Sequence, residues 1–564
     1  MHQKLLTLSY AFFLILTPVS GHSQSPPSAA IATAHPLATK VGEQILGAGG
    51  NAFDAAIAIS SALAVVEPYS SGLGGGGFFL LQNKDGDNVM LDARETAPAK
   101  SSRDMYLDKE GKVNTSLSME GPLSAGIPGL PAALVYMAKH FGRLPLSVTL
   151  APSIKYAQDG FEVTERYRRW AQFRLKLLQR YPSTAQIFLH QNQVPPVGWV
   201  IKQHQLARTL EKIAKTEGHS FYQGDTAKQM VDAVRDAGGI WQLSDLKNYQ
   251  LKVREPVTGN YNGIKVTTAA PPSSGGIVLM SMLNILSGYD LDKTEPAQKK
   301  HLVVEAMRRA YRDRAIYMGD PDFVQIPTSR LLSKEYTDRL RSSIESTIAT
   351  PSNTLPGIKT KDSSHHTTHF SILDKSGNRV AATLTINYPF GSGLVAGDSG
   401  VLLNDEMDDF SAKPGEPNAY GLIGAEANAI AANKRPLSSM TPTFLETDDR
   451  VAILGTPGGS RIITMVLLAA LDFKAGNKPD SWVSLSRYHH QYLPDIIFYE
   501  PDAISEDEAK TLGAMGHELK KLQSPYGDNQ ARYGNMQAIM WDKKENKVYA
   551  ASDPRGEGSA SVIK

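Results

Sequence analysis

Residues 367–387, TTHFSILDKSGNRVAATLTIN, decide the fold, because they predict two strands joined by a tight turn. The runs 368–373 and 380–387 are rich in β-branched and apolar residues, and the DKSGN segment between them has strong turn chemistry. In such a hairpin the paired residue numbers sum to about 752. This register places Thr367 opposite Thr385 and close to Asn387, so two hydroxyls and a carboxamide converge at one strand end.

A hydroxyl nucleophile needs a base, and the sequence offers no convincing Ser-His-Asp grouping around a nucleophile elbow. If the chain were cut before Thr367, the α-amine of that residue would be released two carbons from its hydroxyl. An α-amine titrates at about 7.7 to 8.0, so it can accept the hydroxyl proton near neutral pH. Residues 329–364 are polar and hold Pro351 and Pro356. We expect an exposed tether and a domain boundary there, suited to a cut after His366.

The composition narrows the class of protein. The chain has 564 residues, 59 Lys+Arg against 57 Asp+Glu, and a formal net charge of +2. This near balance argues against nucleic-acid and anionic-membrane partners, which need clustered basic residues. The length predicts more than one structural unit. The absence of cysteine excludes disulfides, thiolate metal sites and a cysteine nucleophile.

The first residues resemble a targeting signal. Lys4 precedes a mostly apolar run over residues 5–19, and the small residues Ser20 and Gly21 follow. We interpret residues 1–21 as a secretory signal peptide, with an uncleaved membrane anchor as the alternative. No later stretch approaches 18 uninterrupted apolar residues, so we expect a periplasmic or secreted protein.

The first part of the chain predicts helices over residues 36–47 and 53–66. The glycine run at residues 72–77 formally satisfies G-x-G-x-x-G, but a helix precedes it and a strand is expected at residues 78–82. A dinucleotide site needs the opposite order, so we expect these glycines to permit close backbone approach instead. Residues 144–319 are expected to be largely helical, with clear cases at 205–215 and 298–317, and offer no catalytic spacing.

Several motifs occur in an order that identifies a family. They are TTHFS at 367–371, NDEMDDFSAKPG at 404–415, PLSSMTPT at 436–443 and PGGSR at 457–461, with LDARE at 91–95 and PPSSGG at 271–276. Together they resemble the γ-glutamyltranspeptidases, which are N-terminal-nucleophile hydrolases. The resemblance covers nearly the whole mature chain and implies an α/β fold, a four-layer αββα sandwich.

The resemblance implies a threonine nucleophile. Thr367 would attack the γ-carbonyl after autocatalytic cleavage of the His366–Thr367 bond, and Thr385 would steady it. Gly458 and Gly459 match the oxyanion-hole glycines, whose bare backbone lets N–H groups approach a developing negative charge.

The resemblance also implies how the γ-glutamyl group is held. Its α-carboxylate would be bound by Arg94, Ser438 and Ser439. Its α-amine would be bound by Asn387, Glu406 and Asp409. A guanidinium on one side and carboxylates on the other complement a zwitterion. Residues 414–424, with Tyr420, resemble the lid loop that shields the acyl-enzyme from water in bacterial members.

The implied function is autoprocessed γ-glutamyl transfer and hydrolysis. The enzyme would cleave glutathione and related γ-glutamyl compounds and pass the acyl group to water, amino acids or peptides. A large subunit (22–366) and a small subunit (367–564) would form a heterodimer, with neither cofactor nor metal. Residues 388–390, Tyr-Pro-Phe, depart from the small hydroxyl residues of many members, so we expect a reshaped pocket rim and an altered acceptor preference.

Other interpretations remain open at this point. An acylase of the same fold could act on a glutaryl side chain, although the lid-like segment argues against it. A secreted binding protein could keep the fold uncut and inert. The acidic residues at 405–409 could form a solvated loop, and Arg94 with Glu95 a surface ion pair. A metal site at His365, His366 and His369 is disfavoured, because an extended chain places these side chains on both of its faces.

Overall fold

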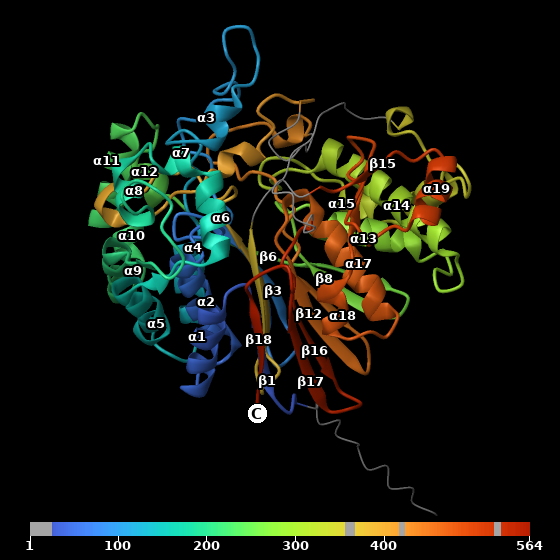
Figure 1. The fold of residues 1–564 in the computed structure, drawn as a ribbon, viewed down its shortest axis with the longest axis horizontal. Helices are drawn as coiled ribbons and strands as arrows, with labels where there is room; N and C mark the ends of the chain where they lie inside the picture. The colour runs from blue at the N-terminus through green and yellow to red at the C-terminus, as the bar shows by residue number, and fades with distance from the viewer. Residues whose placement is uncertain (1–24, 356–366, 417–423, 524–531) are drawn as a thin grey trace, which may run out of the picture.

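The computed structural model describes residues 25–355, 367–416, 424–523 and 532–564. Two β-sheets lie face to face, and a layer of helices covers the outer side of each (Figure 1). The predicted four-layer αββα sandwich is therefore confirmed.

The first sheet has seven strands, and all of its strand pairs are antiparallel. In spatial order they are β18 (Ser559–Ile563), β1 (Ala29–Thr33), β9 (Thr368–Leu373), β10 (Arg379–Thr385), β2 (Gly76–Gln82), β3 (Asn88–Asp92) and β6 (Lys252–Arg254). Strand β1 thus lies between two strands that come after residue 366.

The second sheet has six strands, also antiparallel. In spatial order they are β17 (Lys547–Ser552), β16 (Gln537–Asp542), β12 (Arg450–Gly455), β11 (Thr443–Glu446), β8 (Ile264–Thr268) and β7 (Val257–Tyr261). Apolar side chains of both sheets, among them Leu80, Phe444 and Trp541, form one buried cluster between them.

Each helical layer has its own core. The layer on the first sheet is built mainly from α1 (Pro36–Gly47), α2 (Ala52–Val66), α4 (Leu130–His140), α5 (Leu146–Asp159), α9 (His204–Thr216) and α11 (Asp225–Asp236). The layer on the second sheet is built mainly from α13 (Gly275–Leu286), α14 (Pro296–Tyr317), α17 (Ile462–Lys474), α18 (Pro479–Ser484) and α19 (Glu506–Ala514). All residues of α2 are buried, because this helix packs against α1, α4, α5 and the sheet.

Shorter elements complete the two helical layers and their edges. The helices are α3 (Thr115–Met119), α6 (Glu165–Phe173), α7 (Leu175–Leu178), α8 (Pro182–Phe188), α10 (His219–Tyr222) and α12 (Leu243–Lys247). The strands are β4 (Phe161–Glu162), β5 (Val200–Ile201), β13 (Tyr488–His489), β14 (Ile497–Tyr499) and β15 (Leu519–Lys521).

The hairpin that opens at Thr367 has the predicted register. Strands β9 and β10 pair from Arg379 with Leu373 to Leu384 with Thr368, so the paired numbers sum to 752. At the tip, the Asp374 carboxylate accepts hydrogen bonds from the backbone N–H groups of Ser376 and Asn378. Local turn chemistry therefore fixes which residues face each other at the far end of the hairpin.

The glycine run works as a close-approach segment, as predicted. A Cβ atom on any of three consecutive glycines would lie 2.1 Å from a backbone carbonyl oxygen: Gly74 against Leu402, Gly75 against Thr385, and Gly76 against Ala93. Only glycine lets the chain pass between these segments. The run connects helix α2 to strand β2, which is the reverse of the dinucleotide-binding order.

Two sequence-based expectations are wrong in part. The region 144–319 also contains β6, β7 and β8, which supply edge strands to both sheets. The supposed tether contains α15 (Thr328–Leu331) and α16 (Lys334–Ser342), in which Leu331 and Tyr336 are buried. A few apolar contacts are enough to fold this polar segment onto the core. Residues 356–366 lie outside the described part of the chain.

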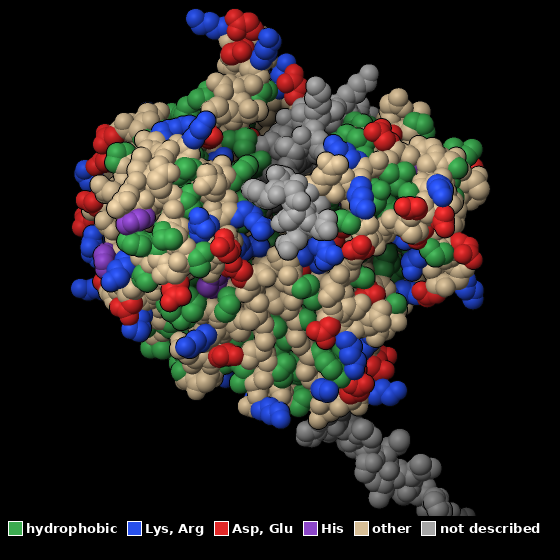
Figure 2. All heavy atoms as spheres, in the orientation of Figure 1, with side chains coloured by type: hydrophobic (Ala, Val, Ile, Leu, Met, Phe, Trp, Pro, Cys, Tyr) green, Lys and Arg blue, Asp and Glu red, His purple; other side chains and the backbone are tan. Residues whose placement is uncertain are grey.

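The visible surface carries both signs of charge. On the face drawn in Figure 2, Lys and Arg are interspersed with Asp and Glu, and no large patch of one sign stands out. Within the described ranges, no helix combines the length and the apolar character needed to cross a bilayer.

Candidate active site

One cavity, of about 310 Å³ including open solvent, gathers most of the predicted site residues. It lies where the hairpin ends in the first sheet meet the loop that follows β12 in the second. Its lining residues are Arg94, Arg314, Thr367, Thr385, Glu406, Asp409, Ser438, Ser439, Met440, Gly459, Ser460 and Ile462.

Thr367 and Thr385 sit at the open end of the hairpin. Leu384 pairs with Thr368, so one further step of the register brings Thr385 opposite Thr367, and both line the cavity. The backbone N–H of Asn387 donates to the Thr385 hydroxyl oxygen at 2.7 Å. A hydroxyl that accepts one hydrogen bond can still donate its own proton, so Thr385 can donate toward Thr367.

Arg94 is buried at the centre of an ion-pair group. It forms salt bridges with Glu406 and Asp409 and donates to the carbonyl oxygens of Pro436 (3.1 Å) and Leu437 (3.0 Å). Burial opposes its charge, but the two carboxylates outweigh that effect and hold the pKa of Arg94 above its usual value.

Glu95 does not form the surface ion pair that a plain interpretation of the sequence suggested. Both Arg94 and Glu95 are buried, and the closest approach of their charged groups is 3.9 Å. Burial raises the pKa of Glu95 to about 8. Among the described residues neither carboxyl oxygen of Glu95 has a hydrogen-bond partner.

The acidic segment is a built part of the site and not a solvated loop. Glu406 and Asp409 lie on a short 3₁₀ turn, Glu406–Asp409, whose start is held by Asn404: its side-chain oxygen accepts from the Glu406 N–H at 2.9 Å. Burial raises the pKa of Glu406 well above its usual value and raises that of Asp409, although Arg94 works against both shifts.

Among the described residues, several buried acceptor oxygens near this turn are unpaired, and two of them belong to predicted site residues. Oε2 of Glu406 and Oδ1 of Asn387 have no hydrogen-bond partner in the part of the chain that the structure describes. Asn387 donates through Nδ2 to the carbonyl oxygen of Asp405 (2.9 Å) and has a φ of 70°. Buried acceptors of this kind usually meet a donor, so the region is suited to a ligand that carries N–H groups.

Ser438 and Ser439 are held by the Pro271–Gly276 motif and by a residue that the sequence did not single out. The N–H and the hydroxyl of Ser274 both donate to the carbonyl oxygen of Ser438 at 2.8 Å. Arg314, from helix α14, donates to the hydroxyls of Ser274 (2.9 Å) and Ser439 (3.0 Å). Helical periodicity predicted α14 but carried no sign that one of its arginines reaches the cavity.

The glycine pair has backbone angles that other residues rarely adopt. Gly458 has a φ of 142° and Gly459 a φ of 57°. Gly459 lines the cavity, whereas Gly458 is not among its lining residues. The pair leads into helix α17 through the turn Gly459–Arg461.

Some predicted residues lie elsewhere. His366 and Tyr420 fall outside the described residues, as does His365. Among the described residues that flank the segment with Tyr420, the N–H of Gly415 donates to the carbonyl oxygen of Gly424 at 3.1 Å. His369 is buried on β9 with Nδ1 2.8 Å from the hydroxyl oxygen of Thr383.

The expected reshaping of the pocket rim by residues 388–390 is not what the structure shows. Phe390 is fully buried against Tyr69 and Tyr167, with ring centroids 6.3 and 5.6 Å away. Tyr388 is also buried and lies under the Arg174 guanidinium, 5.4 Å from its ring centroid. These aromatic side chains fill the helical layer on the first sheet and do not line the cavity.

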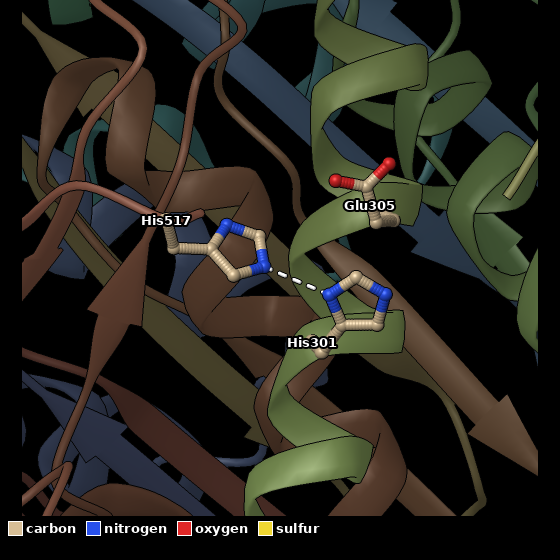
Figure 3. Close-up of side chains that lie close together, drawn as sticks. All are labelled: His301, Glu305 and His517. Carbon is tan, nitrogen blue, oxygen red and sulfur yellow. Dashed lines mark hydrogen bonds between the residues drawn. The ribbon is translucent and has the colours of Figure 1, made fainter. Parts of the chain in front are cut away.

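A second polar cluster lies away from the cavity and joins α14 to a later loop (Figure 3). His301 Nε2 is 2.8 Å from the Glu345 carbonyl oxygen and therefore carries the proton. His301 Nδ1 must then accept from His517 Nε2 at 2.8 Å. His517 Nδ1 faces Arg308 at 3.4 Å, and burial lowers the pKa of His517 to about 3.

This cluster has the residue types of a metal site but not the geometry. Two nitrogens bound to one tetrahedral zinc would lie about 3.3 Å apart, further than the two histidines are. Glu305 is the third candidate ligand, and it forms ion pairs with Arg308 and Arg309. Burial opposes its charge, but these arginines lower the pKa of Glu305 to about 2. The cluster is better described as a hydrogen-bonded contact that connects α14 to the C-terminal part of the chain.

Comparison with known proteins gives matches that agree on one family. The family model described as Gamma-glutamyltranspeptidase matches residues 38–563. The glutathione hydrolase proenzyme of Escherichia coli (strain K12) is 40% identical over 533 residues, 93% of this chain and 90% of that protein. A solved cephalosporin acylase from Bacillus halodurans has a TM-score of 0.83 at 26% identity, over 98% of this chain and 99% of that one. The Helicobacter pylori gamma-glutamyltranspeptidase has a TM-score of 0.56 at 38% identity, over 57% of this chain and 94% of that one.

Proposed function

This chain belongs to the γ-glutamyltranspeptidase family, and from that membership we propose that it transfers γ-glutamyl groups from glutathione and related amides to water, amino acids or peptides. The observation that carries the proposal is the cavity itself. A threonine next to the start of a strand, a glycine with a positive φ and a buried guanidinium–carboxylate group surround one space.

The proposed mechanism begins with cleavage of the His366–Thr367 bond, which frees the Thr367 amine. That amine takes the proton of the Thr367 hydroxyl, and the oxygen attacks the γ-carbonyl carbon. The N–H groups of Gly458 and Gly459 stabilise the oxyanion. The protonated amine then gives its proton to the departing amine, which leaves a γ-glutamyl ester on Thr367. Water or an acceptor amine attacks this ester in the second half of the reaction.

The proposed recognition of the donor uses both of its charges. The α-ammonium would lie against Glu406, Asp409 and Asn387, and the unpaired oxygens of Glu406 and Asn387 support this placement. The α-carboxylate would lie on the side of Arg94, Ser438 and Ser439. Such paired contacts are charge-assisted and directional, which favours a zwitterionic acyl group.

A glutaryl acylase is the second candidate, favoured by the close likeness to the Bacillus halodurans cephalosporin acylase. A glutaryl group has no ammonium, so it would leave the acceptors of Glu406 and Asn387 buried without a donor. Unpaired buried polar groups are costly, so the γ-glutamyl group is the better match to this cavity.

We also propose that residues 1–21 are removed on export, that the enzyme acts in the periplasm or outside the cell, and that segments 22–366 and 367–564 stay together after cleavage. The sheet order supports the last point. Strand β1 of the first segment pairs with β9 and β18 of the second. Separation of the segments would break these ladders and expose the cores between the layers.

The proposed function is tested by incubating purified, cleaved protein with glutathione, with and without glycylglycine. We expect glutamate and cysteinylglycine in the first case, and γ-glutamyl-glycylglycine in addition in the second, both identified by mass spectrometry. Protein with Thr367→Ala, prepared in the same way, is the control for contaminating activity. Fully cleaved wild-type protein that forms none of these products would refute the proposal.

The rate is expected to fall as the pH falls, for two reasons with the same sign. The Thr367 amine must be neutral to accept a proton, and α-amines titrate at about 7.7 to 8.0. Burial raises the pKa of Glu406 and of Asp409. As the pH falls, these two carboxylates are therefore protonated at a higher pH than exposed ones, and they lose the negative charge that holds the donor ammonium. With a γ-glutamyl anilide, kcat should rise toward mildly alkaline pH and KM should increase in acid. A kcat that stays constant from pH 5 to 9 would exclude the amine as the base.

A further inference from the structure

The two arginines of the cavity have different partners. Arg94 is paired with two carboxylates and two carbonyl oxygens. Arg314 is also buried, but the groups that accept its hydrogen bonds are the hydroxyls of Ser274 and Ser439. In the described ranges of the chain, Arg314 forms no salt bridge with a carboxylate.

The two arginines therefore differ in how their charge is balanced. Arg94 forms salt bridges with Glu406 and Asp409. Burial lowers the pKa of Arg314 to about 10, and within the described residues its attraction to Asp409 does not amount to a salt bridge. Burial thus opposes the charge of Arg314, and a ligand anion next to it would offset that cost.

Arg314 also orients the polar groups beside it. Its Nε donates to the Ser274 hydroxyl, which in turn donates to the Ser438 carbonyl oxygen at 2.8 Å. Its Nη2 donates to the Ser439 hydroxyl at 3.0 Å, which leaves the Ser439 proton to point to another acceptor. Ser439 lines the cavity, so that acceptor can be a bound carboxylate. Bonds from a charged donor polarise the hydroxyl and strengthen its own donation.

We propose that Arg314 is a specificity-determining residue, which supplies a second positive charge for the donor α-carboxylate beside Arg94 and orients Ser439 toward it. The ion pairs of Arg94 also hold Glu406 and Asp409 in place for the α-ammonium. This inference rests on the proposed γ-glutamyl function and adds Arg314 to the residues on the carboxylate side of the donor.

The test compares three anilide donors. The γ-glutamyl donor has both charges, the glutaryl donor has only the carboxylate, and the 4-aminobutanoyl donor has only the ammonium. Arg314→Gln should lower kcat/KM for both carboxylate-bearing donors by about 30- to 3,000-fold, the loss that follows removal of one partner of a buried charge pair. Most of the loss should appear in KM. The 4-aminobutanoyl donor should keep its wild-type kcat/KM.

Two further variants separate recognition from a structural effect. Arg314→Lys keeps the positive charge but cannot hydrogen-bond to both serines. Its kcat/KM should therefore fall less than that of Arg314→Gln, and only for the two carboxylate-bearing donors. Lys299→Gln removes a positive charge from the same helix, about 22 Å away along its axis. It should leave kcat/KM unchanged for all three donors. Cleavage of the His366–Thr367 bond is confirmed for each variant before its kinetics are measured.

An equal loss on all three donors by a cleaved Arg314 variant would overturn the inference, because it would show that Arg314 only supports the fold of the loop. If 4-aminobutanoyl turnover is too slow to measure, inhibition by L-glutamate and by 4-aminobutanoate gives the same comparison. If Arg314→Gln is not cleaved, Arg314→Lys decides the question alone. Failure of wild-type protein to use any γ-glutamyl donor would instead count against the proposed function.

Discussion

Thr367→Ala is expected to remain a single chain of about 60 kDa and to lose γ-glutamyl turnover by on the order of a millionfold, as when a covalent nucleophile is removed. In the wild type, the hydroxyl attacks the preceding carbonyl carbon, an N-to-O shift gives an ester, and water opens it. Scaling the 61.3 kDa of the full chain by length, segments 22–366 and 367–564 should appear at about 38 and 22 kDa. A denaturing gel and N-terminal sequencing measure both outcomes.

Thr367→Ser is the matched control, because it keeps the hydroxyl and, after cleavage, the α-amine. It should be cleaved and should retain some turnover through a trapped γ-glutamyl ester on residue 367. Wild-type protein that stays in one piece yet hydrolyses γ-glutamyl amides would refute the N-terminal nucleophile mechanism. A cleaved Ser variant without detectable ester would count against residue 367 as the acylated position.

Asp409→Ala is expected to lower kcat/KM for a γ-glutamyl donor by about 30- to 3,000-fold, since it removes one partner of a buried charge pair at a cost of roughly 2 to 5 kcal/mol. A glutaryl donor lacks the ammonium and leaves Asp409 unmatched in the wild type. That penalty disappears in the variant, so the preference for γ-glutamyl over glutaryl should collapse while the total rate falls.

The measurement is kcat/KM for both donors on both proteins, after each is shown to be fully cleaved. Asp398→Ala, at an exposed aspartate outside the cavity lining, serves as the control for loss of a negative charge. An unchanged preference with an equal loss on both donors would mean that Asp409 supports the fold or the maturation of the chain. The assignment of Glu406 to the ammonium would then weaken with it.

The sequence by itself determined the features that depend on near neighbours. The turn at residues 374–378 and the strand patterns on both sides set a register that the structure repeats to the residue. Helices α1, α2, α9 and α14 begin and end within two residues of their predicted bounds, because periodicity, Pro and Gly are local signals. The ordered motifs identified the family and the sandwich fold.

Only the tertiary structure decided which distant residues share the cavity and with what charge. Arg94 forms an ion pair with Glu406, which lies 312 residues later in the sequence. Arg314 donates a hydrogen bond to Ser439, which lies 125 residues later. Helical periodicity shows which face of α14 is buried but not which residue of that face reaches a polar cavity. In the same way, no local pattern shows that residues 388–390 pack away from the pocket. These outcomes depend on how two sheets and two helical layers are stacked, because burial and charge pairing are set by residues far apart in the chain.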